Sequence, residues 1–140
     1  MKSSVQATEK KASEFLKDIS FKSSSLRLFV DLQKIAQNYE TIKKETKTDI
    51  AAVVKANGYG MGVIPVSTAV YEAGCRKIFV ATLAEGIQLR RHFPQNIQIY
   101  ILNGFSEEDI PFIKEHKLIP VLHSLESFLL WKSYNTRGTR

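Results

Sequence analysis

The sequence has little of what marks several common protein classes. Its 140 residues contain one cysteine, Cys75, which excludes an internal disulfide and a multi-cysteine zinc site. We expect this thiol to be buried beside Gly74, and a single free thiol fits a reducing cytoplasm. No apolar run approaches the roughly 20 residues of a membrane helix, and the N-terminus lacks the apolar segment of a secretory signal. We therefore expect a cytoplasmic protein without a membrane or metal site.

The chain also lacks a concentrated basic surface, although its formal net charge is +6 and its pI is near 9.5. Lysines and arginines are interspersed with acidic residues along most of the sequence, and the locally basic places are the first stretch and the last residues, NTRGTR. A basic stripe interleaved with aromatic residues, typical of nucleic-acid binding, is missing. We expect no nucleic-acid partner.

Glycine and proline are few, 7 and 4, and they fall between periodic segments. Residues 1–25 are polar and rich in serine and lysine, and we interpret them as an N-terminal extension. Residues 26–132 carry a regular pattern of apolar residues. Residues 133–140 have no apolar periodicity and are predicted to be an unstructured tail.

Strands and helices are predicted to alternate through residues 26–132. Strands are predicted at 26–32, 49–56, 77–82, 97–104 and 118–123, and helices at 32–42, 63–73, 83–92, 106–117 and 124–133. Four successive β-α units, counted from the second strand, favour a parallel sheet, and the apolar strands predict that both of its faces are covered. Open doubly wound sheets and closed barrels both fit this pattern. A complete eight-fold barrel takes about 250 residues, so a barrel would be present only as its first half.

The stretch AAVVKANGYGMG, residues 51–62, ends a predicted strand with a lysine and continues into a glycine-rich turn. Catalytic groups of parallel α/β folds lie just past the C-terminal ends of strands, where Lys55 is expected. A partly desolvated amine there can form a Schiff base, and pyridoxal phosphate is the aldehyde cofactor most often held so. A helix-like turn would bring the Tyr59 hydroxyl to the same side as the amine. The alternative is a lysine with a packed stem and a solvated ammonium.

Other polar residues near the predicted strand ends have structural interpretations. Asn57 is expected to hold the glycine turn through side-chain hydrogen bonds to the backbone. Glu85 and Arg90 favour a helix cap or a surface ion pair over catalysis. His123 follows the last predicted strand at the same rim as Lys55, and we expect it to support a loop, because no second metal ligand is suitably spaced.

The lysine stretch resembles the signature of the alanine racemase family, commonly written AVVKANAYGHG. Further segments resemble the family in the same order and at matching intervals: LRLFVDLQKIAQNYETIK, FVATLAEGIQLRRH, IQIYILNGF and LIPVLHSLESF. The resemblance covers about residues 27–131. Gly58 and Met61 stand where the signature has alanine and histidine, and neither position is the nucleophile or the phosphate contact.

The resemblance implies a fold-type III pyridoxal phosphate enzyme, with an eight-fold α/β barrel, a β-rich C-terminal domain and a homodimeric assembly. The fold class would be α/β, a partial (β/α)8 TIM-type barrel of about four β-α units, with residues 26–132 as its N-terminal half. Lys55 would hold pyridoxal 5'-phosphate and act as one of two bases at the α-carbon of alanine. Tyr59 would contact the cofactor phosphate. The product would be D-alanine for peptidoglycan.

Racemisation requires a base on each face of the substrate, and the family's second base is a tyrosine of the C-terminal domain, beyond this sequence. The family's arginines near the cofactor ring and its later phosphate loops are missing too. We therefore expect a truncated N-terminal fragment, inactive alone, and poorly soluble unless a complementary C-terminal fragment or a second copy covers it. The alternatives are a non-catalytic remnant and a pyridoxal phosphate-binding or carrier protein with the same barrel.

Overall fold

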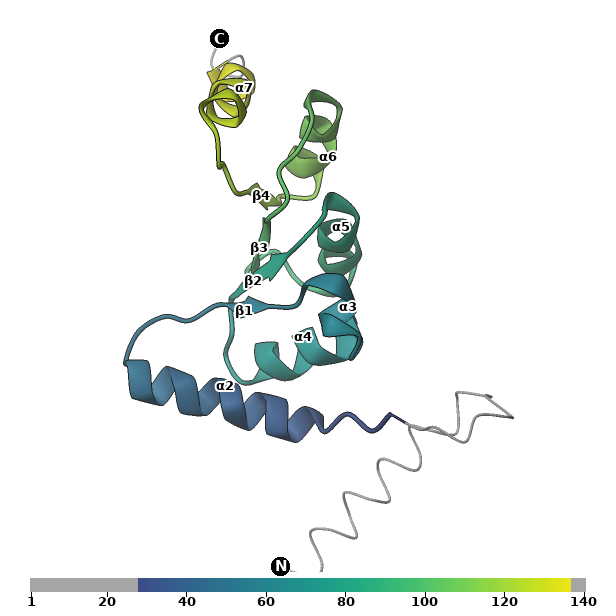
Figure 1. Cartoon of the computed structure of the whole chain (residues 1–140), viewed down its shortest axis with the longest axis vertical. Coiled ribbons are helices and arrows are strands. Elements are labelled where there is room, and N and C mark those ends of the chain that lie inside the picture. The colour runs from purple at the N-terminus through teal and green to yellow at the C-terminus, as the bar shows by residue number, and fades with distance from the viewer. Residues whose placement is uncertain (1–27, 137–140) are drawn as a thin grey trace, which may run out of the picture.

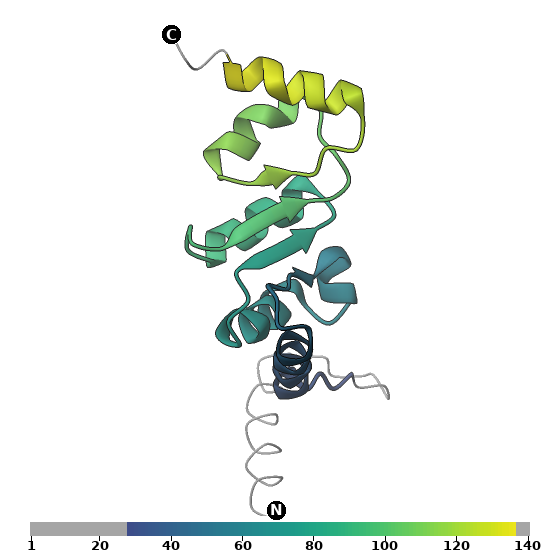
Figure 2. The same ribbon diagram turned by 90° about the vertical axis from the view of Figure 1, so that its left-hand side faces the viewer.

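The computed structural model describes residues 28–136 (Figures 1 and 2). The predicted extension, residues 1–25, and the last four residues of the predicted tail lie outside this part. The strands are β1 (Ala52–Val53), β2 (Lys77–Val80), β3 (Gln98–Ile101) and β4 (Ile119–Pro120). The helices are α2 (Leu32–Thr46), α3 (Lys55–Tyr59), α4 (Val63–Glu72), α5 (Leu83–His92), α6 (Ile110–Glu115) and α7 (Leu125–Thr136), with a 3-10 turn η2 (Glu107–Asp109). None of these helices is long and apolar enough to cross a membrane.

The four strands form one parallel sheet in the order β1-β2-β3-β4. Ile78 of β2 lies opposite Ala52 on one side and Ile99 on the other, and Tyr100 of β3 lies opposite Ile119. A doubly wound sheet reverses its strand order at a switch point, whereas a barrel adds its strands in chain order. The observed order therefore favours a barrel segment over an open doubly wound sheet.

Helices α4, α5 and α6 lie on one side of this sheet, and Figure 2 views the strands from the opposite side. Four side chains of β2 and β3 are fully buried: Ile78, Val80, Ile99 and Ile101. Burial of each contributes about 1.5–3 kcal/mol to stability. The side chains between them are exposed or half-buried, and the rings of Phe79 and Tyr100 stack there with centroids 4.5 Å apart. The prediction that both faces of the sheet are covered is therefore wrong for residues 28–136.

Local capping signals account for where the helices begin. The Asp31 carboxylate accepts from the Lys34 amide at 3.1 Å and starts α2. Thr82 and Glu85 form a capping box at the start of α5, in which each side chain accepts from the other residue's backbone N–H. Helix α5 has the predicted bounds, and the Ser124 hydroxyl accepts from the Ser127 amide at 3.1 Å at the start of α7.

Two predicted boundaries differ from the structure. Residues 28–31 of the predicted first strand form no strand, because no described segment pairs with them. Helix α7 continues to Thr136, into the segment predicted as an unstructured tail. Tyr134 explains this extension: its hydroxyl donates to Glu107, and its carbonyl accepts from the Lys114 ammonium at 2.8 Å.

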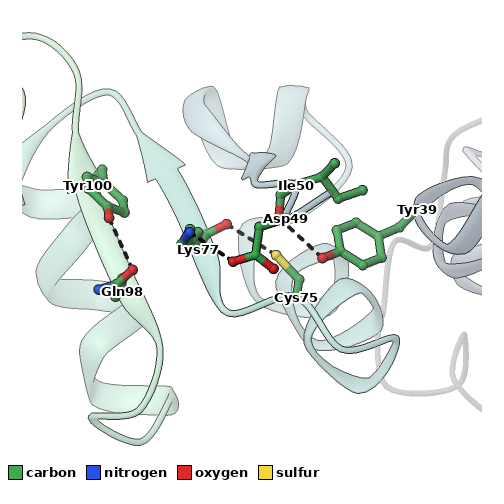
Figure 3. A network of polar contacts seen from close by, with 7 residues as sticks. All are labelled: Tyr39, Asp49, Ile50, Cys75, Lys77, Gln98 and Tyr100. Carbon is green, nitrogen blue, oxygen red and sulfur yellow. Dashed lines mark hydrogen bonds and ion pairs between the residues drawn. The ribbon is translucent and has the colours of Figure 1, made fainter. Parts of the chain in front are cut away.

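A polar network lies at the N-terminal end of the sheet (Figure 3). The Tyr39 hydroxyl donates to the Ile50 carbonyl at 3.3 Å, and the thiol of Cys75, which is buried as predicted, donates to the Lys77 carbonyl at 3.1 Å. The Lys77 ammonium lies 3.0 Å from Asp49; this hydrogen bond lowers the pKa of Asp49 and raises that of Lys77. Because both groups are exposed, the pair contributes little stability. The N-terminal end of a barrel sheet commonly serves stability, and these contacts fit that role.

Candidate active site

Lys55 follows directly on the last pairing of β1. The Val54 amide donates to the Phe79 carbonyl at 2.9 Å, which extends the pairing of β1 with β2 by one residue. Val54 is 1% exposed, whereas Lys55 is half-buried. Lys55 therefore lies at the C-terminal edge of the sheet, where a strand leaves the core and begins to meet solvent.

The turn α3 that begins at Lys55 is left-handed. Ala56, Asn57 and Gly58 have φ values of 52, 54 and 64° with ψ values of 51, 46 and 39°, and Tyr59 has a φ of 55°. The left-handed conformation costs roughly 1–2 kcal/mol for an ordinary L-residue, so the surrounding structure must hold this turn. The turn still bonds over four residues, from the Gly58 amide to the Val54 carbonyl at 2.8 Å and from the Gly60 amide to the Ala56 carbonyl at 3.0 Å, so the predicted helix-like spacing of Lys55 and Tyr59 is present in left-handed form. Tyr59 is 57% exposed.

Contacts to α4 hold the turn from one side. The Asn57 side-chain oxygen accepts from the Val63 amide at 2.9 Å, which confirms the predicted role of Asn57. A Cβ atom on Gly58 would lie 3.3 Å from the Val63 nitrogen, so the backbone approaches α4 more closely than a side chain allows comfortably. A Cβ on Gly62 would lie 2.9 Å from Pro65. A Cβ on Gly60 would meet nothing within 4 Å, so the backbone there faces open space.

Glu85 holds the turn from the other side. One carboxylate oxygen accepts from the Asn57 amide at 3.3 Å. The other accepts from the amides of Ala81 and Thr82 at 2.8 and 3.3 Å. The predicted helix cap is confirmed, but the bond to Asn57 was not predictable, because a Thr-x-x-Glu spacing describes only the local cap and Asn57 lies 28 residues away.

Arg90 and His123 have structural contacts. The Arg90 guanidinium donates to four backbone carbonyls, those of His116, Pro94, Ile97 and Lys117, at 2.9–3.2 Å, and burial lowers its pKa. It therefore ties together the loops that precede β3 and β4. Of the two predicted alternatives, a helix cap or a surface ion pair, Arg90 forms no ion pair within residues 28–136. The ring of His123 donates to the Val121 carbonyl at 3.0 Å. The same ring lies so close to Gly104 that a Cβ added there would be 3.1 Å from it. His123 thus supports the loops after β3 and β4, as predicted.

An open apolar groove of about 530 Å³ lies beside the site, between α2, β1 and α4. Tyr59 and Met61 belong to its lining, and Lys55 does not. The groove therefore lies on the outer edge of β1, and the lysine does not open into it.

The donor groups of the turn fit pyridoxal phosphate. Within residues 28–136, no hydrogen bond or ion pair occupies the Lys55 amine or the Tyr59 hydroxyl. An amine can condense with an aldehyde, and a phenol hydroxyl can donate to a phosphate oxygen. Both groups arise from one five-residue turn, next to the open backbone at Gly60.

A parallel sheet built in chain order, with helices on one face and a lysine past its first strand, defines a segment of a (β/α) barrel. Residues 30–140 match the family model described as alanine racemase, N-terminal domain. The chain belongs to the alanine racemase family and matches part of its N-terminal domain.

Relatives and solved structures agree with this assignment. The chain is 38% identical over 112 residues to an alanine racemase of Rickettsia rickettsii (strain Sheila Smith), covering 79% of this chain and 32% of that protein. It is 39% identical over 112 residues to the biosynthetic alanine racemase of Agrobacterium fabrum, with coverage of 79% and 28%. The crystal structure of alanine racemase from Bartonella henselae with covalently bound pyridoxal phosphate matches with a TM-score of 0.75 at 35% identity, covering 79% of this chain and 33% of that one. The chain thus spans about a third of the length of these relatives.

Proposed function

We propose that this chain supplies the cofactor-binding part of an alanine racemase, which interconverts L-alanine and D-alanine in the cytoplasm and so provides D-alanine for peptidoglycan. The observation that carries the proposal is the half-buried Lys55 at the C-terminal edge of the first barrel strand, within the stretch that carries the family signature. The relative from Bartonella henselae, whose structure holds covalently bound pyridoxal phosphate, supports it.

Lys55 and Tyr59 have separate roles in this proposal. The Lys55 amine would hold the cofactor aldehyde, and as the base on its own face of the substrate it would take the α-proton in one direction of the reaction and give it back in the other. The Tyr59 hydroxyl donates to the cofactor phosphate. Bound pyridoxal phosphate supplies an electron sink for the charge left at the α-carbon. Both residues belong to the five-residue turn α3, so the backbone sets the spacing between the amine-bearing and the phosphate-binding position.

The proposal assigns the second base to a part of the enzyme other than these 140 residues. Racemisation needs a base on the opposite face of the substrate, and Lys55 serves one face only. We propose that a complementary C-terminal part, within a homodimer, supplies that base. The 140-residue chain would then take up pyridoxal phosphate without racemising alanine.

A spectroscopic titration tests the proposal. Pyridoxal phosphate is added to the chain, to Lys55→Ala and to Lys43→Ala, and the visible absorption band of the lysine-bound cofactor is recorded. Lys43 is the matched control, because it is exposed in the last turn of α2. The band should appear with the unmodified chain and with Lys43→Ala and be absent with Lys55→Ala. Equal bands in all three proteins would contradict the proposal.

A carrier or remnant with the same barrel would give the same band, so activity must separate it from a racemase part. The C-terminal part of a relative, which has the remaining barrel units, is mixed with the 140-residue chain. Racemisation of L-alanine that depends on Lys55 supports the racemase proposal. Cofactor uptake without activity in the assembled mixture supports a carrier.

A further inference from the structure

Lys55 leaves the sheet through a backbone conformation that its own sequence does not favour. Three residues that follow it and carry a Cβ, Ala56, Asn57 and Tyr59, have φ values of 52–55°. Asparagine tolerates this region better than alanine or tyrosine. The turn therefore needs contacts from outside itself, and these contacts fix the direction in which the Lys55 side chain departs.

Glu85 provides such a contact from the neighbouring β-α unit. Its bond to the Asn57 amide is the only hydrogen bond in residues 28–136 that joins the turn 55–62 to a β-α unit other than its own. The carboxylate also accepts from Ala81 and Thr82, directly after β2. A single half-buried side chain thus joins the turn after β1 to the turn after β2 through three amide donors.

We propose that Glu85 is a positioning residue for Lys55: its carboxylate bridges the left-handed turn and the start of α5, and so sets the orientation of the lysine amine. This inference rests on the proposed function for its consequence in cofactor binding. The bridge itself depends only on the contacts of Glu85. A carboxylate suits the role because it is acceptor-only on both oxygens, and all its partners here are N–H donors.

The substitution Glu85→Gln separates the bridge from the helix cap. The glutamine oxygen can still accept from Ala81 and Thr82, while its NH2 group would face the Asn57 N–H, donor against donor. Asp109→Asn is the matched control. Asp109 accepts from the Ser106 amide at 2.8 Å and from the Ser106 hydroxyl at 3.0 Å in the same type of cap, two β-α units further along the chain from Lys55.

Three measurements on the 140-residue chain test the inference: amide hydrogen exchange, the rate at which an amine-selective acylating reagent labels Lys55, and the affinity for pyridoxal phosphate. In Glu85→Gln, exchange at Asn57 should rise about tenfold, while exchange within α5 is unchanged. The labelling rate of Lys55 should change relative to Lys43. Affinity for pyridoxal phosphate and for phosphate-free pyridoxal should fall by the same factor of about ten, because the effect acts through the amine. Asp109→Asn should change none of these.

The outcomes separate this inference from the proposed function. If Glu85→Gln leaves Asn57 exchange, Lys55 labelling and cofactor affinity as in the unmodified chain, the positioning role is wrong although the proposed function stands. If the unmodified chain takes up no cofactor, the proposed function fails. The exchange and labelling results then still decide whether Glu85 holds the turn: changes confined to Glu85→Gln support it, and equal values in both variants overturn it.

Discussion

Among the residues of the site, the glycines of the turn have unequal tasks. Gly60 and Gly62 both have positive φ values, 82 and 97°, which an ordinary side chain disfavours. The space around them differs, because a Cβ at position 60 would meet nothing within 4 Å and one at position 62 would lie 2.9 Å from Pro65. Alanine substitutions at these two positions therefore separate the free-energy cost of the backbone conformation from the cost of steric overlap with a neighbour.

Gly62→Ala should destabilise the fold more than Gly60→Ala. For Gly60→Ala we expect about 1–2 kcal/mol from the backbone alone. For Gly62→Ala we expect a further loss of stability of about 1–3 kcal/mol, because Pro65 must move. Urea unfolding at one fixed protein concentration measures both. Equal losses of stability would show that Pro65 yields without cost.

Tyr59→Phe tests the assignment of the phosphate contact. A hydrogen bond to a charged group contributes about 1.5–3 kcal/mol, so affinity for pyridoxal phosphate should fall at least about tenfold. Pyridoxal, which has no phosphate, serves as the control ligand, and its binding should be unchanged. Fluorescence or absorbance titrations give both affinities. A parallel loss for both ligands would place Tyr59 beside the aldehyde or the ring, away from the phosphate.

The sequence predicted some of these residues and not others, for physical reasons. The place of Lys55 followed from a strand end and the role of Asn57 from local turn chemistry, and both depend on near neighbours in the chain. The left-handed turn was not predictable, because Ala56 and Tyr59 rarely adopt such a φ and only the packed structure imposes it. The bond from Asn57 to Glu85 joins residues 28 positions apart, and no local pattern encodes it.

Among the elements, helices were predicted more accurately than strands. Helix α5 begins with the Thr82–Glu85 capping box and has the predicted bounds, because a cap depends only on residues that are close together in the chain. Strand β1 has two residues where eight were predicted, because a strand extends only as far as its partner does. The barrel order of the strands became visible only from their pairing.

Helix α2 is bonded through the Tyr39 hydroxyl to Ile50, in the segment that leads into β1, and the contribution of this bond to stability should depend on pH. Burial, together with the neighbouring Cys75, raises the pKa of Tyr39 to about 12. Its folded-state pKa therefore lies above the ordinary value of 10.0, so its stabilising effect is complete below pH 10 and is lost between about pH 10 and 12. Tyr39→Phe should lose about 0.5–1.5 kcal/mol at neutral pH, from the bond to Ile50.

An alkaline unfolding series on the unmodified chain and Tyr39→Phe checks this prediction. The difference in stability between the two proteins should shrink as the pH rises from 10 to 12. Tyr100→Phe is the control, because within residues 28–136 the Tyr100 hydroxyl bonds only to the exposed side chain of Gln98. A difference that stays constant to pH 12 would show that Tyr39 ionises without affecting the fold.

In the molecule as a whole, we expect the sheet face that carries no helices, together with the outer strands, to determine how the chain associates with other chains. The paired positions Val53, Phe79, Tyr100 and Ile119 form a row across all four strands, and in β2 and β3 this row alternates with the buried side chains of Ile78, Val80, Ile99 and Ile101. This row is apolar or aromatic, and within residues 28–136 no helix covers it. An apolar row beside the unpaired strand edges favours association with another copy or another chain.

The 140-residue chain should therefore self-associate, and lysines in the row should weaken that association. The double variant Val53→Lys/Ile119→Lys is expected to raise the monomer fraction in sedimentation velocity runs at matched concentration. Gln98→Lys is the control, because Gln98 lies on the same face but outside the row, opposite Lys77. A monomeric unmodified chain with one cooperative unfolding transition would contradict the prediction.

Chemical mapping of the attached cofactor tests the central claim most directly. The chain is incubated with pyridoxal phosphate, the bond to the amine is reduced with borohydride, and peptides are analysed by mass spectrometry to identify the modified lysine. At substoichiometric cofactor the adduct should lie on Lys55, and the exposed lysines of α2, such as Lys43, should stay unmodified. Adducts spread evenly over surface lysines, with Lys55 no more modified than Lys43, would contradict it.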